Sequence, residues 1–483
     1  MNIPLVLNLA GVVLIFSSGF MLIPLLFSLY YKGADASALG VSLLLTLFSG
    51  LILYFVNRSQ RRVELKHRDG FAVVTISWLI MSLCGSFPYI FSGVSVSFTD
   101  AYFESMAGFT TTGATVFRDL GGMPGGILLW RSLTQWIGGM GIIVLSIAIL
   151  PMLGVGGMQL FKAEVPDIRL EKIRPRILDI AKSLWYIYAG LTLTLALLLM
   201  LGGMSIFDAV CHAFTTMATG GFSTKDESIA FFQSAYIDFI ITLFMLLAGV
   251  NFSLHFYALR GKLSRFTRSS EFRFYCSVVL LSSIVVTFSL ILSGNYSSVS
   301  EALRYATFQV ASIMTTTGYA TADYELWPFF PQMLLICLMF FGGMVGSTGG
   351  GMKQVRILLI FKQAYRELYH LIHPHAVSAL KLDGKRLPKE TIGGIWGFLF
   401  LFILIFVFAS LCMTMMGVDL VTSVTTVISA MSNVGPALGE AGPTNNYSAI
   451  PVPGKWVLIL CMLLGRLEIY TVIVLFVPHF WRK

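Results

Sequence analysis

The chain has 483 residues, of which 56% are hydrophobic and 12% charged, and its net charge is +9. Its apolar residues form runs of about twenty, long enough to cross a hydrocarbon core of about 30 Å as helices. This pattern excludes an outer-membrane barrel, whose strands alternate strictly over about ten residues. The composition therefore predicts an all-α polytopic membrane protein.

Ten membrane-spanning segments are predicted in chain order, near residues 6–31, 38–57, 70–93, 125–149, 181–203, 234–259, 272–294, 331–369 (interrupted), 392–417 and 455–478. The even number places both termini on one side of the membrane. The first segment lacks a basic n-region and a clean small-residue cleavage site, so we interpret it as an anchor rather than a signal peptide.

The distribution of Lys and Arg predicts the orientation. Of the 33 such residues, 26 lie in the connections 58–69, 151–182, 260–273, 353–390 and 482–483. By the positive-inside rule this side and both termini face the cytoplasm. The positive charge also favours contact with anionic membrane lipid, whereas its scatter over separate loops argues against a nucleic-acid partner.

Sites for enzyme chemistry are not indicated. The six cysteines fall in apolar segments without C-x-x-C spacing, which predicts neither a disulfide framework nor a metal site. No Walker, Rossmann, nucleophile-elbow or HExxH pattern occurs. The one metal-like cluster, His370, His373 and His375, lacks a carboxylate or Cys, and we expect an ordinary interfacial turn. His212 and His255 are expected to be packing residues.

A Gly-centred turn between a short amphipathic segment and a long apolar one occurs four times, as Thr111-Thr112-Gly113, Ala218-Thr219-Gly220, Thr316-Thr317-Gly318 and Asn433-Val434-Gly435. The glycines are 107, 98 and 117 residues apart, and a second glycine follows each turn, namely Gly138, Gly249, Gly342 and Gly465. We therefore expect two N-terminal helices (1–60) and four similar units around one pore, over residues 70–150, 178–260, 271–370 and 391–483.

The segment before each turn is too short to cross the membrane. It suits a half-helix that enters and returns, a geometry tolerated where it lines a water-filled cavity. Such a helix directs the negative end of its dipole at the pore axis, and a glycine at positive φ lets the following carbonyls turn inward. Rings of carbonyl oxygens could then replace the hydration shell of a cation. The alternative is four unrelated loops, which the steady period argues against.

Two features are expected below this filter. Gly346, Ser347, Thr348, Gly349, Gly350 and Gly351 interrupt an apolar segment, and each glycine costs a helix about 1 kcal/mol relative to Ala. The break should line the cavity, unless it is a passive helix-packing surface. Arg466 in an apolar span costs about 2.5–3.5 kcal/mol and should face the pore. The alternative is a structural Arg paired to carbonyls, Glu104 or Glu468.

Five stretches carry a family resemblance: TTTGAT (110–115), TGGFST (219–224), FFGGMVGSTGGGMK (340–353), NVGPALG (433–439) and LGRLEIY (464–470). Together they resemble the TrkH/TrkG branch of the Trk/Ktr/HKT potassium transporters over essentially the whole chain. The resemblance implies four helix–pore-helix–helix repeats about a pseudo-fourfold axis, usually in a homodimer. It also implies potassium uptake across the bacterial inner membrane, under a cytoplasmic TrkA-type subunit that binds the nucleotide (ATP, ADP or NAD).

The same resemblance assigns roles to residues. It implies that K⁺ ions are held by backbone carbonyls at 111–113, 218–220, 316–318 and 433–435, that 346–351 is an intramembrane gating loop, and that Arg466 lies in the pore. The turns depart from the TVGYG of K⁺ channels, so selectivity could be looser.

Two alternative functions make different demands on the sequence. An H⁺- or Na⁺-coupled K⁺ symporter, or a less selective monovalent cation transporter, of this same fold stays open. Inverted repeats, the usual transporter signature, are absent from the pattern, because these units run in parallel. An intramembrane enzyme would need a nucleophile–base or metal constellation inside the spans, and we find none.

Overall fold

The computed structural model describes residues 1–57, 67–144, 173–376 and 378–481. Within them, six helical stretches are long and apolar enough to cross a membrane. These are α1 (Ile3–Tyr30), α2 (Ala36–Val56), α3 with α4 (His67–Gly85 and Phe87–Phe91), α9 (Ile173–Leu201), α14 (Ser270–Leu292) and α18 (Lys389–Met415). Only 28% of the most apolar window of α2 and of α18 is buried. The apolar surface that remains exposed suits a lipid environment rather than water.

Two further predicted spans are broken. α11 (Ala235–Ala248) and α12 (Phe252–Leu259) meet at a bend of 100°, and α20 (Val452–Arg466) meets α21 (Tyr470–Ile473) with η9 (Val474–Phe476) at 110°. At the first break Asn251 begins α12 by accepting the Ser253 N–H. At the second break Glu468 and Ile469 have φ of 57° and 28°, which a helix does not accommodate. Counting each pair as one span gives up to eight crossings.

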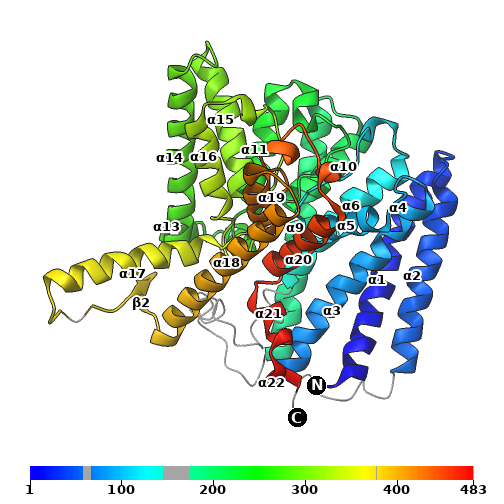
Figure 1. Ribbon diagram of the computed structural model, residues 1–483, viewed down its shortest axis with the longest axis horizontal. Helices are drawn as coiled ribbons and strands as arrows, with labels where there is room; N and C mark the ends of the chain where they lie inside the picture. Colours follow the sequence, from blue (N-terminus) through cyan, green and yellow to red (C-terminus); the bar gives the residue numbers. More distant parts are fainter. Residues whose placement is uncertain (58–66, 145–172, 377, 482–483) are drawn as a thin grey trace.

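Of the remaining two predicted spans, 125–149 is described only in part, and 331–369 differs from expectation. α6 (Gly125–Val144) covers most of 125–149, whose last residues lie outside the described part of the chain. In the predicted interrupted span 331–369, α16 (Phe329–Met339) is followed by a loop and then by α17 (Gln354–Ile372). Figure 1 shows α17 running crosswise to α14 and α16. α17 therefore does not continue the span, because charged residues such as Arg356, Lys362 and Arg366 keep it too polar.

Four shorter helices lie in the interior, namely α5 (Phe98–Phe109), α10 (Ile206–Met217), α15 (Val299–Met314) and α19 (Leu420–Ser432). α5 has 12 residues, so at 1.5 Å per residue it spans only about 18 Å. Side chains of Ser97, Ser205 and Asp419 accept a first-turn N–H and fix the starts of α5, α10 and α19.

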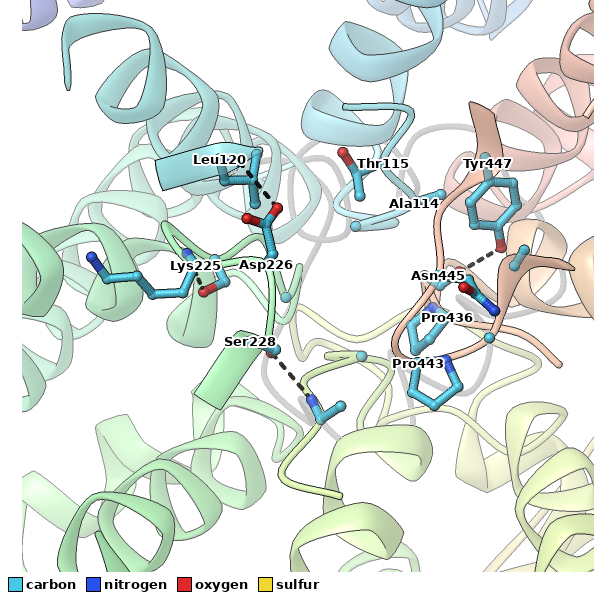
Figure 2. A pocket seen from close by; sticks show the side chains of 18 of the residues that line it. Ala114, Thr115, Leu120, Lys225, Asp226, Ser228, Pro436, Pro443, Asn445 and Tyr447 are labelled. Carbon is cyan, nitrogen blue, oxygen red and sulfur yellow. Dashed lines mark hydrogen bonds between the residues drawn. The ribbon is translucent and has the colours of Figure 1, made fainter. Parts of the chain in front are cut away.

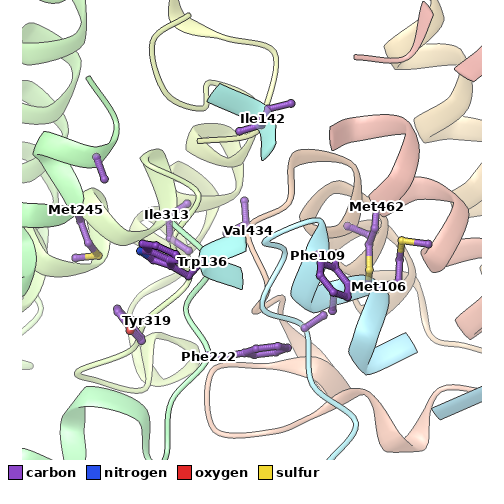
Figure 3. Close-up of a cluster of buried hydrophobic side chains, with 14 of the residues drawn as sticks. Met106, Phe109, Trp136, Ile142, Phe222, Met245, Ile313, Tyr319, Val434 and Met462 are labelled. Atoms are coloured by element: carbon purple, nitrogen blue, oxygen red, sulfur yellow. The ribbon is translucent and has the colours of Figure 1, made fainter. Parts of the chain in front are cut away.

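One buried cluster joins these helices to the longer ones. Figure 3 shows members from widely separated parts of the chain, including Met106, Phe109, Trp136, Phe222, Met245, Ile313, Val434 and Met462. The core therefore surrounds the point where the short helices end, and packing at native density keeps their ends in place.

The N-terminal hairpin packs against α6. A Cβ on Gly11 would lie 2.8 Å from the Gly50 carbonyl oxygen, so α1 and α2 approach closely. Between them, buried Asp35 accepts the Ile127 N–H at 2.9 Å and so caps the first turn of α6. At the opposite end of α1, the Asn2 N–H bonds Asp69 at 2.8 Å, and Arg68 reaches the Phe480 carbonyl of α22 (Pro478–Trp481) at 3.5 Å. Both ends of the described chain thus meet at α3 (Figure 1).

Short elements fill the connections. They are α13 (Ser264–Arg268), the 3₁₀ turns η2 (Leu120–Gly122), η5 (Ser228–Phe232), η6 (Tyr324–Leu326), η7 (Gly439–Ala441) and η8 (Tyr447–Ala449), and the antiparallel hairpin β1 (Lys381–Leu382) with β2 (Lys385–Arg386).

Candidate functional site

Each short helix ends in the same hydrogen-bonded turn. One N–H bonds the carbonyl three residues back and the next N–H bonds the carbonyl five residues back, which is the Schellman motif. The five-residue bonds join Thr112 to Ala107, Gly220 to Thr215, Thr317 to Ser312 and Val434 to Ser429, at 2.8, 2.9, 2.8 and 2.9 Å. We call the stretches that follow, residues 110–116, 218–224, 315–321 and 432–438, the first to fourth ring segments.

The left-handed residue of this turn is unusual. Helices generally place Gly there, but the four positions hold Thr111 (φ 51°), Thr219 (54°), Thr316 (62°) and Asn433 (57°). A β-branched residue at positive φ is strained, and such strain persists only where the surroundings impose it. All four residues are buried. The strain thus falls on the three Thr residues where the segments converge, whereas Asn433 adopts this conformation readily.

The second ring segment corrects the predicted register by one residue. Two residues beyond each left-handed position stands a glycine at positive φ: Gly113 (80°), Gly221 (77°), Gly318 (83°) and Gly435 (104°). The pattern of four turns predicts that Ala218, Thr219 and Gly220 correspond to Thr111, Thr112 and Gly113. In the structure Thr219, Gly220 and Gly221 occupy those places, and Ala218 is still the cap of α10.

These four glycines close a ring. A Cβ on Gly113 would collide with the Gly220 carbonyl oxygen, one on Gly221 with that of Thr317, and one on Gly318 with that of Val434. The ring returns to its start at Gly435, where a Cβ would lie 2.7 Å from the Thr112 oxygen. Each segment therefore touches the next through a glycine and a carbonyl, a contact that any side chain would prevent.

The outer loops interlock in the same order. The Leu120 N–H bonds Asp226 at 3.1 Å, the Ala230 N–H bonds the Ala320 carbonyl at 3.1 Å, Tyr324 Oη bonds the Ala437 carbonyl at 3.2 Å, and the Tyr447 N–H bonds the Thr115 carbonyl at 2.8 Å. Between these loops lies an open pocket whose lining includes the four positive-φ glycines. Figure 2 shows Lys225 and Asp226 on one side of it, with Pro436 and Tyr447 on the other. The pocket is thus a vestibule above the ring.

The loop 340–353, between α16 and α17, lies against the ends of the short helices. Thr348 Oγ1 donates to the Met217 carbonyl of α10 at 3.0 Å, and the Gly350 N–H bonds Thr316 Oγ1 at 2.7 Å. A Cβ on Gly350 would collide with the carbonyl of Ser432, the last residue of α19. The predicted break 346–351 therefore adjoins the second, third and fourth ring segments.

Arg466 connects this loop to α6. The residue is 2% exposed, and its guanidinium donates to the carbonyls of Thr348 at 2.7 Å and Gly138 at 3.2 Å. The carboxylates considered as its partners are paired elsewhere, Glu104 with Arg131 at 2.6 Å and Glu468 with Arg356 at 2.5 Å. The structure thus brings together the Gly-rich break 346–351 and Arg466, which lie more than a hundred residues apart in the sequence.

The second glycine of each unit serves close packing. A Cβ on Gly138 would collide with the Phe109 carbonyl of α5, and one on Gly465 with the Met431 carbonyl of α19. Gly249 and Gly342 similarly face Tyr275 and Gly350. The contacts of Gly138 and Gly465 let α6 and α20 approach the ends of α5 and α19.

Sequence reasoning missed two residues of α6, Arg131 and Gln135, which contact the second ring segment. Arg131 donates to the Ser223 carbonyl at 2.8 Å, and Gln135 to the Gly220 carbonyl at 2.7 Å. Their spacing of four residues places both on one helix face, a signal the sequence did contain.

The histidines form ordinary hydrogen bonds. His212 bonds Ser223 Oγ at 3.0 Å, and His370 bonds Ser378 Oγ at 2.7 Å. Among the described residues, no group of three His, Cys, Asp or Glu side chains could hold a metal ion.

The long apolar helices and their broken partners make this chain a multi-pass membrane protein, and comparisons with known proteins agree. Residues 42–483 match the TrkH family, described as "Cation transport protein". A solved structure, the potassium transporter TrkH from Vibrio parahaemolyticus, superposes with a TM-score of 0.93 at 40% identity, covering 100% of both chains.

Curated relatives match over the same length. The chain is 45% identical to the Trk system potassium uptake protein TrkH of Halomonas elongata and 43% identical to that of Salmonella typhimurium, each over 100% of both chains. It is 34% identical to TrkG of Escherichia coli, over 100% of this chain and 99% of the relative. The chain belongs to the TrkH family. The relatives are named as transport proteins, which confirms the expectation of a non-enzymatic transporter.

Proposed function

We propose that the chain is the potassium-conducting subunit of a bacterial Trk-type uptake system and that K⁺ passes through the ring of four segments. The observation that carries this proposal is the closed series of glycine–carbonyl contacts, in which every unit contributes the same turn. The negative ends of four helix dipoles meet there and favour a cation. Backbone carbonyls at 111–113, 219–221, 316–318 and 433–435 are the proposed K⁺ ligands, by analogy with rings that replace a hydration shell.

The loop 340–353 and Arg466 form the proposed gate. The loop contacts the ends of three short helices, and Arg466 holds its Thr348 carbonyl. A buried cation next to the ring opposes the passage of another cation. Opening then requires the loop and Arg466 to move together, because they share a hydrogen bond.

The same proposal includes the location of the protein, its orientation and its partners. The inner membrane is the proposed location, with both termini and the Lys- and Arg-rich connections in the cytoplasm. A homodimer is proposed, together with a TrkA-type cytoplasmic subunit through which a nucleotide would act. The relatives' name, "Trk system", supports a system of several components.

Flux into liposomes tests the proposal. Purified protein is reconstituted, and uptake of K⁺, Rb⁺ and Na⁺ is recorded under a cation gradient, with and without a pH gradient. We expect K⁺ to pass in preference to Na⁺ without any pH gradient. Uptake that requires a proton or sodium gradient would favour a symporter, and equal K⁺ and Na⁺ uptake would refute a potassium-selective filter.

A further inference from the structure

Helix α6 holds the second ring segment through Gln135. Gln135 Nε2 donates to the Gly220 carbonyl at 2.7 Å, and its Oε1 accepts the Phe222 N–H at 3.1 Å. Because one partner is an acceptor and the other a donor, they fix the orientation of the amide. Gln135 is fully buried, so both bonds lie out of reach of water.

Arg131, one turn earlier on the same face, reinforces this contact. Its guanidinium donates to the Ser223 carbonyl at 2.8 Å and lies 3.6 Å from the centre of the Phe222 ring. The buried Glu104 of α5 pairs with it at 2.6 Å and also accepts the Val116 N–H of the first ring segment at 2.9 Å. Residues 220–223 are therefore fixed to α6 and, through Glu104, to the neighbouring segment.

The contact explains why the second ring segment carries an extra glycine. The other segments hold Thr112, Thr317 and Val434 where this one holds Gly220. A Cβ on Gly220 would collide with Gln135, whose Nε2 would lie only 2.7 Å away. Gln135 thus occupies the space that a side chain fills in the other three segments. This is also the physical origin of the one-residue offset.

The donated bond makes the ring unequal. The carbonyls of Thr112, Gly220, Thr317 and Val434 are the ones that contact the neighbouring glycines. Of these four carbonyls, in the described part of the chain, only that of Gly220 accepts a hydrogen bond from a side chain, although the next carbonyl of the fourth segment, Gly435, accepts from Ser429 and Tyr447. Sharing its lone pairs with an amide weakens the Gly220 oxygen as a cation ligand, and the bond also restrains it from moving inward.

We propose that Gln135 is a selectivity-determining residue, acting as a positioning residue on the Gly220 carbonyl; this rests on the proposed potassium function. Both effects of the bond disfavour Na⁺ relative to K⁺. The smaller ion needs a contracted site with strong-field ligands, whereas the restrained, weakened oxygen suits the larger ion. Arg131 supports Gln135 by holding the Ser223 carbonyl of the same segment, and Glu104 in turn pairs with Arg131.

The test compares Gln135→Met, which keeps the length and loses both bonds, with Gln332→Met. Gln332 also bonds two backbone groups, the carbonyls of Glu325 and Trp327 at 2.8 Å each, but lies outside the ring. In liposomes, Q135M is expected to lower the K⁺/Na⁺ flux ratio by about fivefold, the factor typical of one lost hydrogen bond. The readout is this ratio rather than the K⁺ flux itself, and Q332M should leave the ratio unchanged.

The outcomes separate the two proposals. A wild-type protein without K⁺ preference refutes the potassium filter itself. If the wild type prefers K⁺ and the K⁺/Na⁺ flux ratio of Q135M is unchanged, only the role of Gln135 is refuted. If Q332M lowers the K⁺/Na⁺ flux ratio as much as Q135M does, the loss is a general effect of destabilisation, and the role of Gln135 is refuted as well.

A second pair of variants tests steric complementarity. Gly220→Ala alone should impair assembly, measured as the monodisperse fraction in detergent, because its Cβ collides with Gln135. Gly220→Ala with Gln135→Ala should recover assembly but show the lowered K⁺/Na⁺ ratio. Where Q135M fails to assemble, this double variant supplies the flux measurement. Failure of the double variant to assemble, or its normal ratio, overturns the inference.

Discussion

Replacing Arg466 with Gln should open the proposed gate. The wild-type guanidinium is buried and donates to both Thr348 and Gly138, and the shorter Gln side chain cannot span the two carbonyls. A hydrogen bond from a buried charged group contributes about 1.5–3 kcal/mol. Losing the bond to Thr348 therefore shifts the closed loop toward open by about ten- to a hundredfold, at 1.36 kcal/mol per decade.

The assay is K⁺ uptake into liposomes without any regulatory subunit. R466Q should raise this basal flux at least several-fold and leave the K⁺/Na⁺ ratio near wild type, because the ring segments are untouched. Arg466→Lys should be intermediate, since it keeps the charge but loses the planar donor fork. Arg304→Gln is the control, because it breaks the pair with Asp238 (2.7 Å) away from the ring. Lower flux in correctly assembled R466Q would mean that Arg466 braces the pore.

Three further changes probe the ring and the loop. Gly113→Ser should raise relative Na⁺ flux, because the new side chain at φ 80° displaces the Gly220 carbonyl; unchanged selectivity would remove Gly113 from the filter. Deleting Gly349 and Gly350 should raise basal K⁺ flux and weaken any control by a regulator, whereas reduced flux in inserted protein would favour a structural role. Gly465→Ala should lower the thermal unfolding midpoint, as its Cβ collides with the Met431 carbonyl and overpacking costs about 1–3 kcal/mol; a wild-type midpoint would contradict that contact.

The sequence carried enough signal for the class of fold, because long apolar runs and repeated Gly-centred turns are local features. It could not resolve the second turn, where Gly220 and Gly221 can both adopt positive φ. The choice is made by Gln135, more than eighty residues away, which takes the space beside Gly220. A tertiary contact therefore sets a register that local propensity leaves open.

The ion pairs between buried charged residues could not be predicted from the sequence either. The sequence offers both Glu104 and Glu468 as partners of Arg466. In the structure Glu104 pairs with Arg131, and Glu468 pairs with Arg356. α17 shows the opposite case. Its charges at Arg356, Lys362 and Arg366 were visible in the sequence, yet the apolar residues around them suggested a continued span.

The four ring segments belong to one polypeptide, and this has a consequence for how ion preference can vary. In a pore formed by four identical subunits, every substitution is repeated four times, so that it changes all four walls of the pore at once. Here a single codon changes one wall, and the equivalent places already hold three residue types, Thr at 112 and 317, Gly at 220 and Val at 434. In the proposed filter, discrimination between ions can therefore be adjusted in small steps, with three unaltered walls preserving conduction while the fourth changes.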